Sequence, residues 1–417
     1  MNASIANASW LKTPETQRVI AALDAARPGG SRFVGGCVRN ALMGRGVDDI
    51  DIATQLSPDQ TVAAAEKAGL AAHPTGIDHG TITVVANHHP YEVTTLRRDV
   101  TTDGRRATVA FTENWEEDAQ RRDFRLNALY ADASGHVFDP TGGGVEDAKA
   151  RRVIFVGDPE TRLREDYLRI LRFFRFNAWY GSGALDPVGL AACSALKAGL
   201  DGLSAERVWK ETKKLIAAPD PRVALAAMEQ AGVRAQALPE MTEQGRLASL
   251  IGLEKELLLD CDPLTRIAAA LPDAGATRTL ARRLKISNEE RERLVAAQAG
   301  SLGDEPRIVS FMSLREVRRA LYRLGTEAFC DRAKLAWAAQ GEDKSATQWR
   351  ALLELAKTWT RPVLLLTGDD VMAAGVPVGP KIGQVLREVE AWWVDADFPD
   401  DKLSIVERLK AVAQGMT

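Results

Sequence analysis

The sequence predicts an α+β protein, with a small mixed β-sheet in an N-terminal head and helices in the rest of the chain. Up to about residue 130, segments in which apolar residues alternate as in a strand are interspersed with segments in which they have helical spacing. Beyond about residue 145 the strand patterns nearly vanish, and Ala, Leu, Arg and Glu become abundant. We therefore expect three parts: a head at residues 1–148, a helical neck at 149–218, and a helical body and tail at 219–417.

The elements of the head have their own start and stop signals. Two predicted helices, at residues 13–27 and 58–69, begin with a capping hydroxyl residue followed directly by proline. Short apolar and β-branched runs predict strands at residues 32–35, 81–86 and 91–96. The last two runs are separated by a short polar segment that ends in proline, so we expect a β-hairpin there.

Composition excludes several classes of protein. The chain has 417 residues, of which 45% are hydrophobic and 27% charged, as in ordinary globular proteins. No apolar run approaches the roughly 20 residues that a membrane helix needs, so we expect no membrane partner. The four cysteines lie far apart and form no Cys-x-x-Cys pair, so we expect neither a zinc partner nor a disulfide. These features predict a cytoplasmic protein.

The most specific pattern in the head is a Gly-Gly turn followed by an Asp-x-Asp strand. Gly35 and Gly36 allow the backbone to approach a phosphate, and Arg39 in the following helix adds a charged donor. A strand that begins at Asp49 places Asp49 and Asp51 on one face, because alternate residues of a strand point the same way. Two neighbouring carboxylates repel each other unless a cation joins them. We therefore predict Mg²⁺ at these two aspartates and nucleotide phosphates at the turn.

A third carboxylate, Glu92, lies among apolar residues in the predicted strand 91–96. If this strand runs beside the Asp-x-Asp strand, Glu92 completes a two-metal catalytic site. The alternative is an exposed glutamate of a strand with no catalytic role.

Residues 161–176 have apolar side chains at helical spacing, which predicts one amphipathic helix. Asp166 and Arg169 lie beside the apolar stripe, and Arg172 and Arg175 follow at steps of three. Cytosine and adenine each present an amino donor next to a ring-nitrogen acceptor, whereas uracil and guanine reverse these groups. An Asp–Arg pair could therefore select C and A without a nucleic-acid template. The alternative is a set of surface ion pairs, each worth only a few tenths of a kcal/mol.

Three motifs occur in order between residues 30 and 215: Gly-Gly-x-Val-Arg with Asp-x-Asp-Ile-Ala-Thr, then Arg-Arg-Asp-Phe-x-x-Asn-Ala, then Glu-Asp-x-x-Arg-x-x-Arg. Together they resemble the class II tRNA nucleotidyltransferase (CCA-adding enzyme) and bacterial poly(A) polymerase family. One departure is Asn40, where the family pattern usually has Asp. Asparagine keeps the hydrogen-bonding capacity but loses the charge.

The resemblance implies roles for further residues. Arg122 would hold a phosphate or ribose oxygen of the nucleotide, and Asp123 and Asn127 would order the sugar hydroxyls. Residues 97–118 would form a flexible loop that closes over the nucleotide. The aspartate and first arginine of the third motif would pair with the base, and its later arginines would support the base or the phosphates.

The sequence therefore predicts an enzyme that adds CMP and AMP to the 3′ end of tRNA from CTP and ATP, with Mg²⁺ and with release of pyrophosphate. Its expected partners are tRNA, ATP and CTP. A poly(A) polymerase of the same family, or a partial enzyme that adds only CC or only A, remains open because these enzymes share the head and neck. An alternative of another class is a non-catalytic RNA-binding protein, against which the intact aspartate pair argues.

Two basic clusters in the C-terminal half could follow an RNA backbone or be solvated helix faces. They are Arg282, Arg283 and Lys285, and Arg315, Arg318, Arg319 and Arg323.

Overall fold

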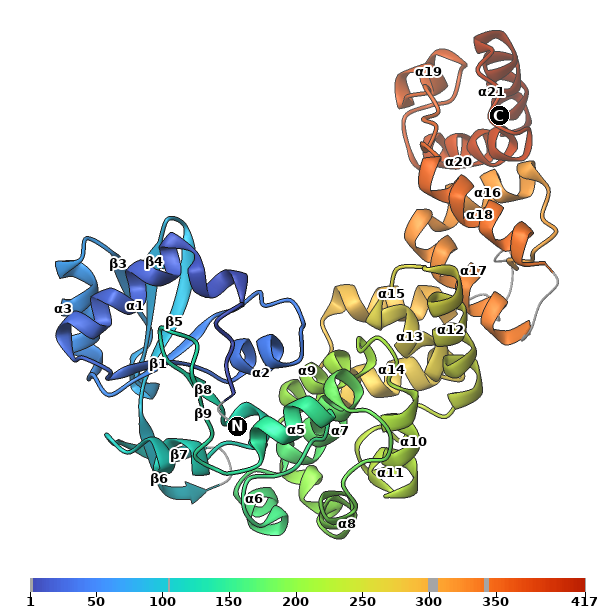
Figure 1. Cartoon of the computed structure of the whole chain (residues 1–417). Coiled ribbons are helices and arrows are strands. Elements are labelled where there is room, and N and C mark those ends of the chain that lie inside the picture. The colour runs from blue at the N-terminus through green and yellow to red at the C-terminus, as the bar shows by residue number, and fades with distance from the viewer. Residues whose placement is uncertain (1–2, 104–105, 299–306, 341–344, 417) are drawn as a thin grey trace. The chain divides into compact units, whose positions relative to one another are not determined.

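A computed structural model describes residues 3–103, 106–298, 307–340 and 345–416 (Figure 1). The chain divides into two compact units, Met1–Pro239 and Glu240–Thr417. The first unit contains the β-sheet, and the described residues of the second are helical. The predicted α+β fold class is thereby confirmed. The finer division at residues 148 and 218 stays a prediction. No described helix is both long enough and apolar enough to cross a membrane.

The main sheet has seven strands in the order β3-β4-β5-β2-β1-β8-β9. Strands β2 and β5 run parallel, and the other neighbouring pairs run antiparallel. The strands are β1 (Ser31–Val34), β2 (Asp51–Thr54), β3 (Ala71–Gly76), β4 (Thr81–Ala86), β5 (His89–Thr95), β8 (Tyr130–Ala131) and β9 (Val137–Phe138). The predicted hairpin is confirmed: Asn87 and His88, both with positive φ, connect β4 to β5.

The predicted loop at residues 97–118 is wrong for most of its length. Strands β6 (Arg97–Asp103) and β7 (Arg106–Phe111) pair as an antiparallel ribbon, and α4 (Trp115–Gln120) follows. The polar composition of this segment favoured a loop. Threonine and valine recur in both strands, and their preference for extended backbone outweighed the polar composition. Residues 104–105 of the expected loop lie outside the described residues. Closure of this segment over a nucleotide stays a prediction.

The helices of the first unit begin where the sequence predicts caps. Thr13 caps α1, and Ser57 forms a reciprocal capping box with Gln60 at the start of α3. Both helices pack against each other and against β4. The other α-helices of this unit, apart from α4, are α2 (Gly36–Leu42), α5 (Gly144–Ala150), α6 (Pro159–Glu165), α7 (Leu168–Tyr180), α8 (Pro187–Ala195), α9 (Ala205–Ile216), α10 (Arg222–Gln230) and α11 (Val233–Ala237), with α1 at Pro14–Ala26 and α3 at Pro58–Lys67.

The single helix predicted at residues 161–176 is wrong, because the chain breaks between α6 and α7. Asp166 has extended backbone, with φ of −156° and ψ of 104°. Its Oδ1 accepts a hydrogen bond from the backbone N–H of Leu168, 3.1 Å away, and so starts the next helix. An aspartate side chain that accepts from a nearby backbone N–H competes with the carbonyl oxygen that this N–H would bond in a continuous helix. The apolar spacing continued through the break and concealed it.

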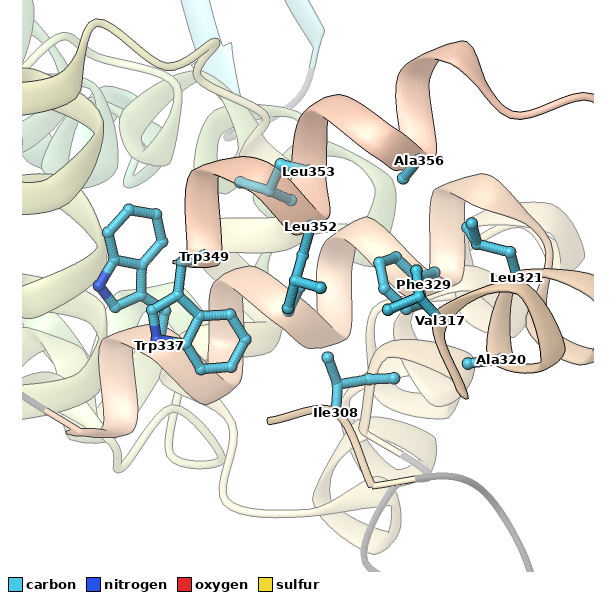
Figure 2. Packing of buried hydrophobic residues seen from close by; sticks show 11 residues of the cluster. Ile308, Val317, Ala320, Leu321, Phe329, Trp337, Trp349, Leu352, Leu353 and Ala356 are labelled. Atoms are coloured by element: carbon cyan, nitrogen blue, oxygen red, sulfur yellow. The ribbon is translucent and has the colours of Figure 1, made fainter. Parts of the chain in front are cut away.

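The second unit is built of helices around several apolar clusters. Its α-helices are α12 (Gln244–Leu257), α13 (Pro263–Ala270), α14 (Ala274–Arg283), α15 (Asn288–Gln298), α16 (Leu314–Leu324), α17 (Thr326–Gln340), α18 (Ala346–Thr358), α19 (Gly368–Ala373), α20 (Pro380–Asp395) and α21 (Lys402–Met416). Figure 2 shows the cluster between α16, α17 and α18. At one end of it, the rings of Trp337 and Trp349 stack with centroids 6.1 Å apart.

Replacing Trp349 with alanine should destabilise the second unit by about 3–5 kcal/mol, the usual cost of a buried tryptophan cavity. Trp349 is 0% exposed, and its replacement would leave Trp337 without its stacking partner. Urea unfolding followed by circular dichroism measures the loss. Phe311→Ala is the control, because Phe311 is 82% exposed. Equal losses in the two variants would contradict the assignment of Trp349 to a packed core.

Candidate active site

Asp51 and Glu92 lie side by side on the main sheet. Asp51 begins β2 and is the register partner of Glu92 in the parallel strand β5. Register partners project from the same face, and the next residue of each strand projects from the other. Those next residues, Ile52 and Val93, are buried in the core. The two carboxylates therefore share the opposite face of the sheet.

Asp49 lies two residues before Asp51 in the chain. We expected the strand to begin at Asp49, but β2 begins at Asp51. The pairing of β1 with β2 ends at Phe33 and Ile52, because the chain turns at Gly35 to begin α2. Asp49 is therefore an exposed residue of the connection that leads into β2.

The negative charges of Glu92 and Asp49 both act on the ionisation of Asp51. The pKa of Asp51 is raised to about 6, first by burial and then by the negative charge of Glu92, with a further contribution from Asp49; Arg122 acts in the opposite direction. Carboxylates held together in this way favour a bound cation. In the described part of the chain, no three His, Cys, Asp or Glu side chains are close enough to enclose a metal ion. Carboxylate oxygens are hard donors of the kind that Mg²⁺ takes together with water and substrate phosphate.

The Gly-Gly turn brings the backbone next to Arg122. Gly35 has a φ of +71°, which favours glycine, and a Cβ there would lie 3.6 Å from Nη1 of Arg122. The other side of the guanidinium is fixed: Nη2 donates to Oδ2 of Asp118 at 3.0 Å, and Nε donates to the hydroxyl oxygen of Tyr130 at 3.2 Å. Sequence reasoning missed Asp118 and Tyr130. The spacing of Asp118 and Arg122, four residues apart, was the available signal.

Asp118 should contribute to stability in a pH-dependent manner. The side chain of Asp118 is 2% exposed. Burial raises the pKa of its carboxyl group, but the positive charges of Arg122 and Arg121 outweigh burial. The pKa is therefore lowered from an ordinary 3.8 to about 2. A carboxyl group whose pKa is lower in the folded than in the unfolded protein stabilises the fold at pH values above its unfolded-state pKa. This stabilisation is lost as the pH falls through the folded-state pKa. The shift corresponds to about 2 kcal/mol.

Urea unfolding of Asp118→Asn and wild type tests this expectation. We expect the variant to be less stable by about 2 kcal/mol at neutral pH, and the difference to narrow between pH 4 and pH 2. Exposed Glu116 lies on the same helix, and Glu116→Gln is the matched control. A deficit that does not change with pH would show that the charge of Asp118 is not what stabilises the fold.

Arg39 makes its contacts within the protein. It is 5% exposed, and its Nη1 donates to Oδ1 of Asn127 at 2.5 Å. Its Nε and Nη2 donate to Oδ1 of Asn40, and its guanidinium lies 3.7 Å from the ring centroid of Tyr180. Nδ2 of Asn40 donates to the carbonyl oxygen of Gly46. Asparagine at position 40 thus accepts from one partner and donates to another, which an ionised aspartate could not do.

Asp123 connects the second motif to α7. It is 8% exposed; its Oδ2 accepts from Nε of Arg172 at 2.9 Å, and its Oδ1 accepts from Nδ2 of Asn127 at 3.1 Å. Burial raises the pKa of Asp123, but the positive charge of Arg172 and the hydrogen bonds outweigh burial and lower it overall. The expected sugar-binding residues are therefore part of a buried network in this structure.

The third motif is held by α9. Oδ2 of Asp166 accepts from Nη2 of Arg207 at 2.6 Å. Nε of Arg175 donates to Oε2 of Glu211 at 2.6 Å, and Arg172 lies 3.8 Å from the same carboxylate. Sequence reasoning missed Arg207 and Glu211, although their spacing of four places both on one face of a helix.

Arg169 contacts the segment that ends the second motif. Its Nη1 donates to Oε2 of Glu165 at 2.6 Å, and its Nη2 donates to the carbonyl oxygen of Arg121 at 3.1 Å. The backbone N–H of Arg169 donates to the carbonyl oxygen of Asp166 at 3.0 Å, but the two side chains have separate partners, Arg207 and Glu165. The structure therefore places both residues of the predicted base-selecting pair between the second motif and α9.

These elements define a nucleotidyltransferase-like head followed by helical parts. Three family models match: Poly A polymerase head domain at residues 31–154, Probable RNA and SrmB-binding site of polymerase A at 184–244, and tRNA nucleotidyltransferase domain 2 at 267–409. The chain belongs to the family of CCA-adding tRNA nucleotidyltransferases.

Relatives over nearly the whole chain carry this assignment. The CCA-adding enzyme of Streptococcus gordonii is 33% identical, covering 95% of this chain and 97% of the relative. The human mitochondrial CCA tRNA nucleotidyltransferase 1 is 32% identical, covering 91% and 86%. The crystal structure of the Bacillus stearothermophilus CCA-adding enzyme in complex with CTP has a TM-score of 0.76 and 26% identity, and the match covers 97% of this chain and 99% of that one.

Proposed function

We propose that this enzyme adds CMP and AMP to the 3′ end of tRNA, using CTP and ATP and releasing pyrophosphate. The observation that carries the proposal is the pairing of Asp51 with Glu92 on one face of the sheet, together with the guanidinium of Arg122 next to the Gly-Gly turn. Membership of the CCA-adding family supports the choice of tRNA as the acceptor and of CTP and ATP as the donors.

Asp49 and Asp51 are the proposed ligands of Mg²⁺, and Glu92 is the proposed third catalytic carboxylate. When bound, the ion would neutralise triphosphate charge and lower the pKa of the primer 3′-hydroxyl. The residues around it position the donor: Arg122, held by Asp118, directs Nη1 toward the turn at Gly35. Attack of the 3′-oxygen on the α-phosphorus forms the new phosphodiester and breaks the bond to the β-phosphate, so pyrophosphate leaves.

Arg39 has a proposed role that differs from direct phosphate contact. Its guanidinium is enclosed by Asn40, Asn127 and Tyr180. It therefore positions α2 and the second motif around the Gly35-Gly36 turn, whose backbone is the part proposed to face the nucleotide. Asp123, bonded to both Asn127 and Arg172, extends the same support to α7.

Asp166 and Arg169 are proposed to pair with the incoming base, and Arg172 and Arg175 to support them. A carboxylate oxygen has more than one lone pair, so Asp166 can accept from a base amino group and keep its bond to Arg207. Arg169 would exchange its bond to Glu165 for the base nitrogen. The arginines that follow are held by Glu211 and Asp123, which gives the pair a fixed support.

An end-extension assay on tRNA lacking its 3′ CCA tests the function. Labelled CTP and ATP are supplied singly and together with Mg²⁺, and products are resolved to one nucleotide. We expect two C additions, then one A, then a stop. Addition of CC alone, or of A only to a CC end, would mean a partial activity; long A tails would mean a poly(A) polymerase; and no incorporation would favour a non-catalytic RNA-binding protein.

A further inference from the structure

An arginine-rich cavity lies in the second unit, apart from the three motifs. It has a volume of about 820 Å³ and is formed by α14, α15, α16 and α17. Five arginines line it against a single glutamate, Glu292. The arginines are Arg278, Arg282, Arg291, Arg323 and Arg332. A concave surface with this charge excess favours an anionic ligand.

The remaining lining of the cavity is apolar. It consists of Ala281, Val295, Ala296, Leu324 and Ala328. Arg332 joins the two kinds of surface: it is 6% exposed, and its Nε donates to the carbonyl oxygen of Ala296 at 2.6 Å. Its guanidinium is therefore fixed in the wall, whereas Arg278, Arg282 and Arg323 are exposed at the cavity. The cavity offers apolar side chains together with several cationic groups.

Four arginines of the cavity, Arg278, Arg282, Arg291 and Arg323, have few or distant carboxylate partners among the described residues. Among the described residues, no carboxylate oxygen lies within 4 Å of the guanidinium nitrogens of Arg278 or Arg282. Arg291 and Arg323 have only long ion pairs, each of 3.6 Å, to Glu292 and Asp395. This imbalance leaves positive charge available to a ligand.

Neighbouring arginines outside the cavity are paired closely. Arg283 lies 2.7 Å from Glu240, and Arg318 lies 2.9 Å from Asp397. The two basic clusters noted in the sequence are thereby divided: Arg282 and Arg323 line the cavity, while these neighbours hold parts of the fold together.

We propose that this cavity binds a phosphorylated nucleotide, at a site separate from the catalytic head. The phosphates would lie on Arg278 and Arg282, since guanidinium groups bind phosphate oxygens in pairs. The base would lie on the apolar surface and could stack on a guanidinium plane. The volume is suited to a ligand of this size and much too large for a single inorganic anion. The proposed ligand is a free nucleotide, which a cavity of this volume can enclose, and binding of RNA at the same arginines is the alternative that the test separates from it.

Two binding arms test the proposal with Arg278→Ala/Arg282→Ala. The control is Arg350→Ala/Arg387→Ala, which removes two exposed arginines of α18 and α20 in the same unit. In the first arm, labelled 8-azido-ATP is photo-crosslinked to the full chain, and labelled peptides are mapped. In the second, filter binding measures the affinity for tRNA lacking CCA over a series of salt concentrations. Circular dichroism confirms that each variant is folded.

One result supports the proposal: label appears in peptides from residues 278–332 of wild type and falls about tenfold or more in the cavity variant but not in the control. If tRNA affinity falls and the salt slope decreases by about two without such labelling, the arginines belong to a tRNA-binding surface and the proposal is overturned. It is also overturned if the cavity variant matches the control in both arms. Neither arm needs incorporation, so failure here is distinguishable from failure of CCA addition.

Discussion

Replacing Asp49 with alanine should reduce CMP and AMP incorporation by about a thousandfold or more and leave the fold intact. Loss of a metal-binding carboxylate removes several kcal/mol of transition-state stabilisation. The fold should not suffer, because Asp49 is exposed and its side chain has no hydrogen bond or ion pair with a described residue. Initial rates of end extension, together with the circular dichroism spectrum, measure both parts of the expectation.

Asp48→Ala is the matched control for this prediction. Asp48 directly precedes Asp49, is also exposed, and has no place in the proposed site. A second measurement is independent of activity: Mg²⁺ should raise the unfolding midpoint of wild type and of Asp48→Ala more than that of Asp49→Ala. If Asp49→Ala kept incorporation within tenfold of the control, the assignment of Asp49 as a metal ligand would be wrong.

Strand β2 and the turn that begins α2 could be predicted from the sequence because their signals are local. The alternation around Asp51 and the glycines of the turn act over a few residues, and the structure keeps both. The start of β2 could not be predicted as well, since it depends on where β1 stops pairing. For Arg39, the sequence shows a cation near a helix start but not that Tyr180 and Asn127 enclose it.

The neck was harder to predict because its contacts join distant parts of the chain. Asp166 bonds to Arg207, 41 residues further on, and Arg172 bonds to Asp123, 49 residues earlier. An unbroken helical spacing suggested one helix, but the carboxylate of Asp166 accepts a hydrogen bond from the N–H of Leu168 where the helix breaks. The other carboxylate oxygen accepts from Arg207 of α9, a contact between distant residues that no local pattern contains.

Replacing Asp166 with alanine should relax the choice of nucleotide more than it slows the use of CTP. We expect discrimination of CTP against UTP, and of ATP against GTP, to fall by about a hundredfold. The reason is that UTP and GTP would no longer place an acceptor against the carboxylate oxygen, while CTP and ATP would lose one hydrogen bond. Ratios of kcat/KM for each pair of nucleotides, measured on tRNA ending before or after CC, test this expectation. The Mg²⁺ dependence should change little, because Asp166 lies outside the carboxylate cluster.

Arg207→Ala separates base pairing from support of the neck. It removes the ion pair with Asp166 but keeps the carboxylate, whose Oδ1 still accepts from the N–H of Leu168. We therefore expect Arg207→Ala to lower kcat/KM for all nucleotides alike and to keep most of the discrimination. If it relaxed discrimination as far as Asp166→Ala does, the ion pair with α9 and not the carboxylate would determine the choice of base. Full discrimination in Asp166→Ala would show that another residue selects C and A.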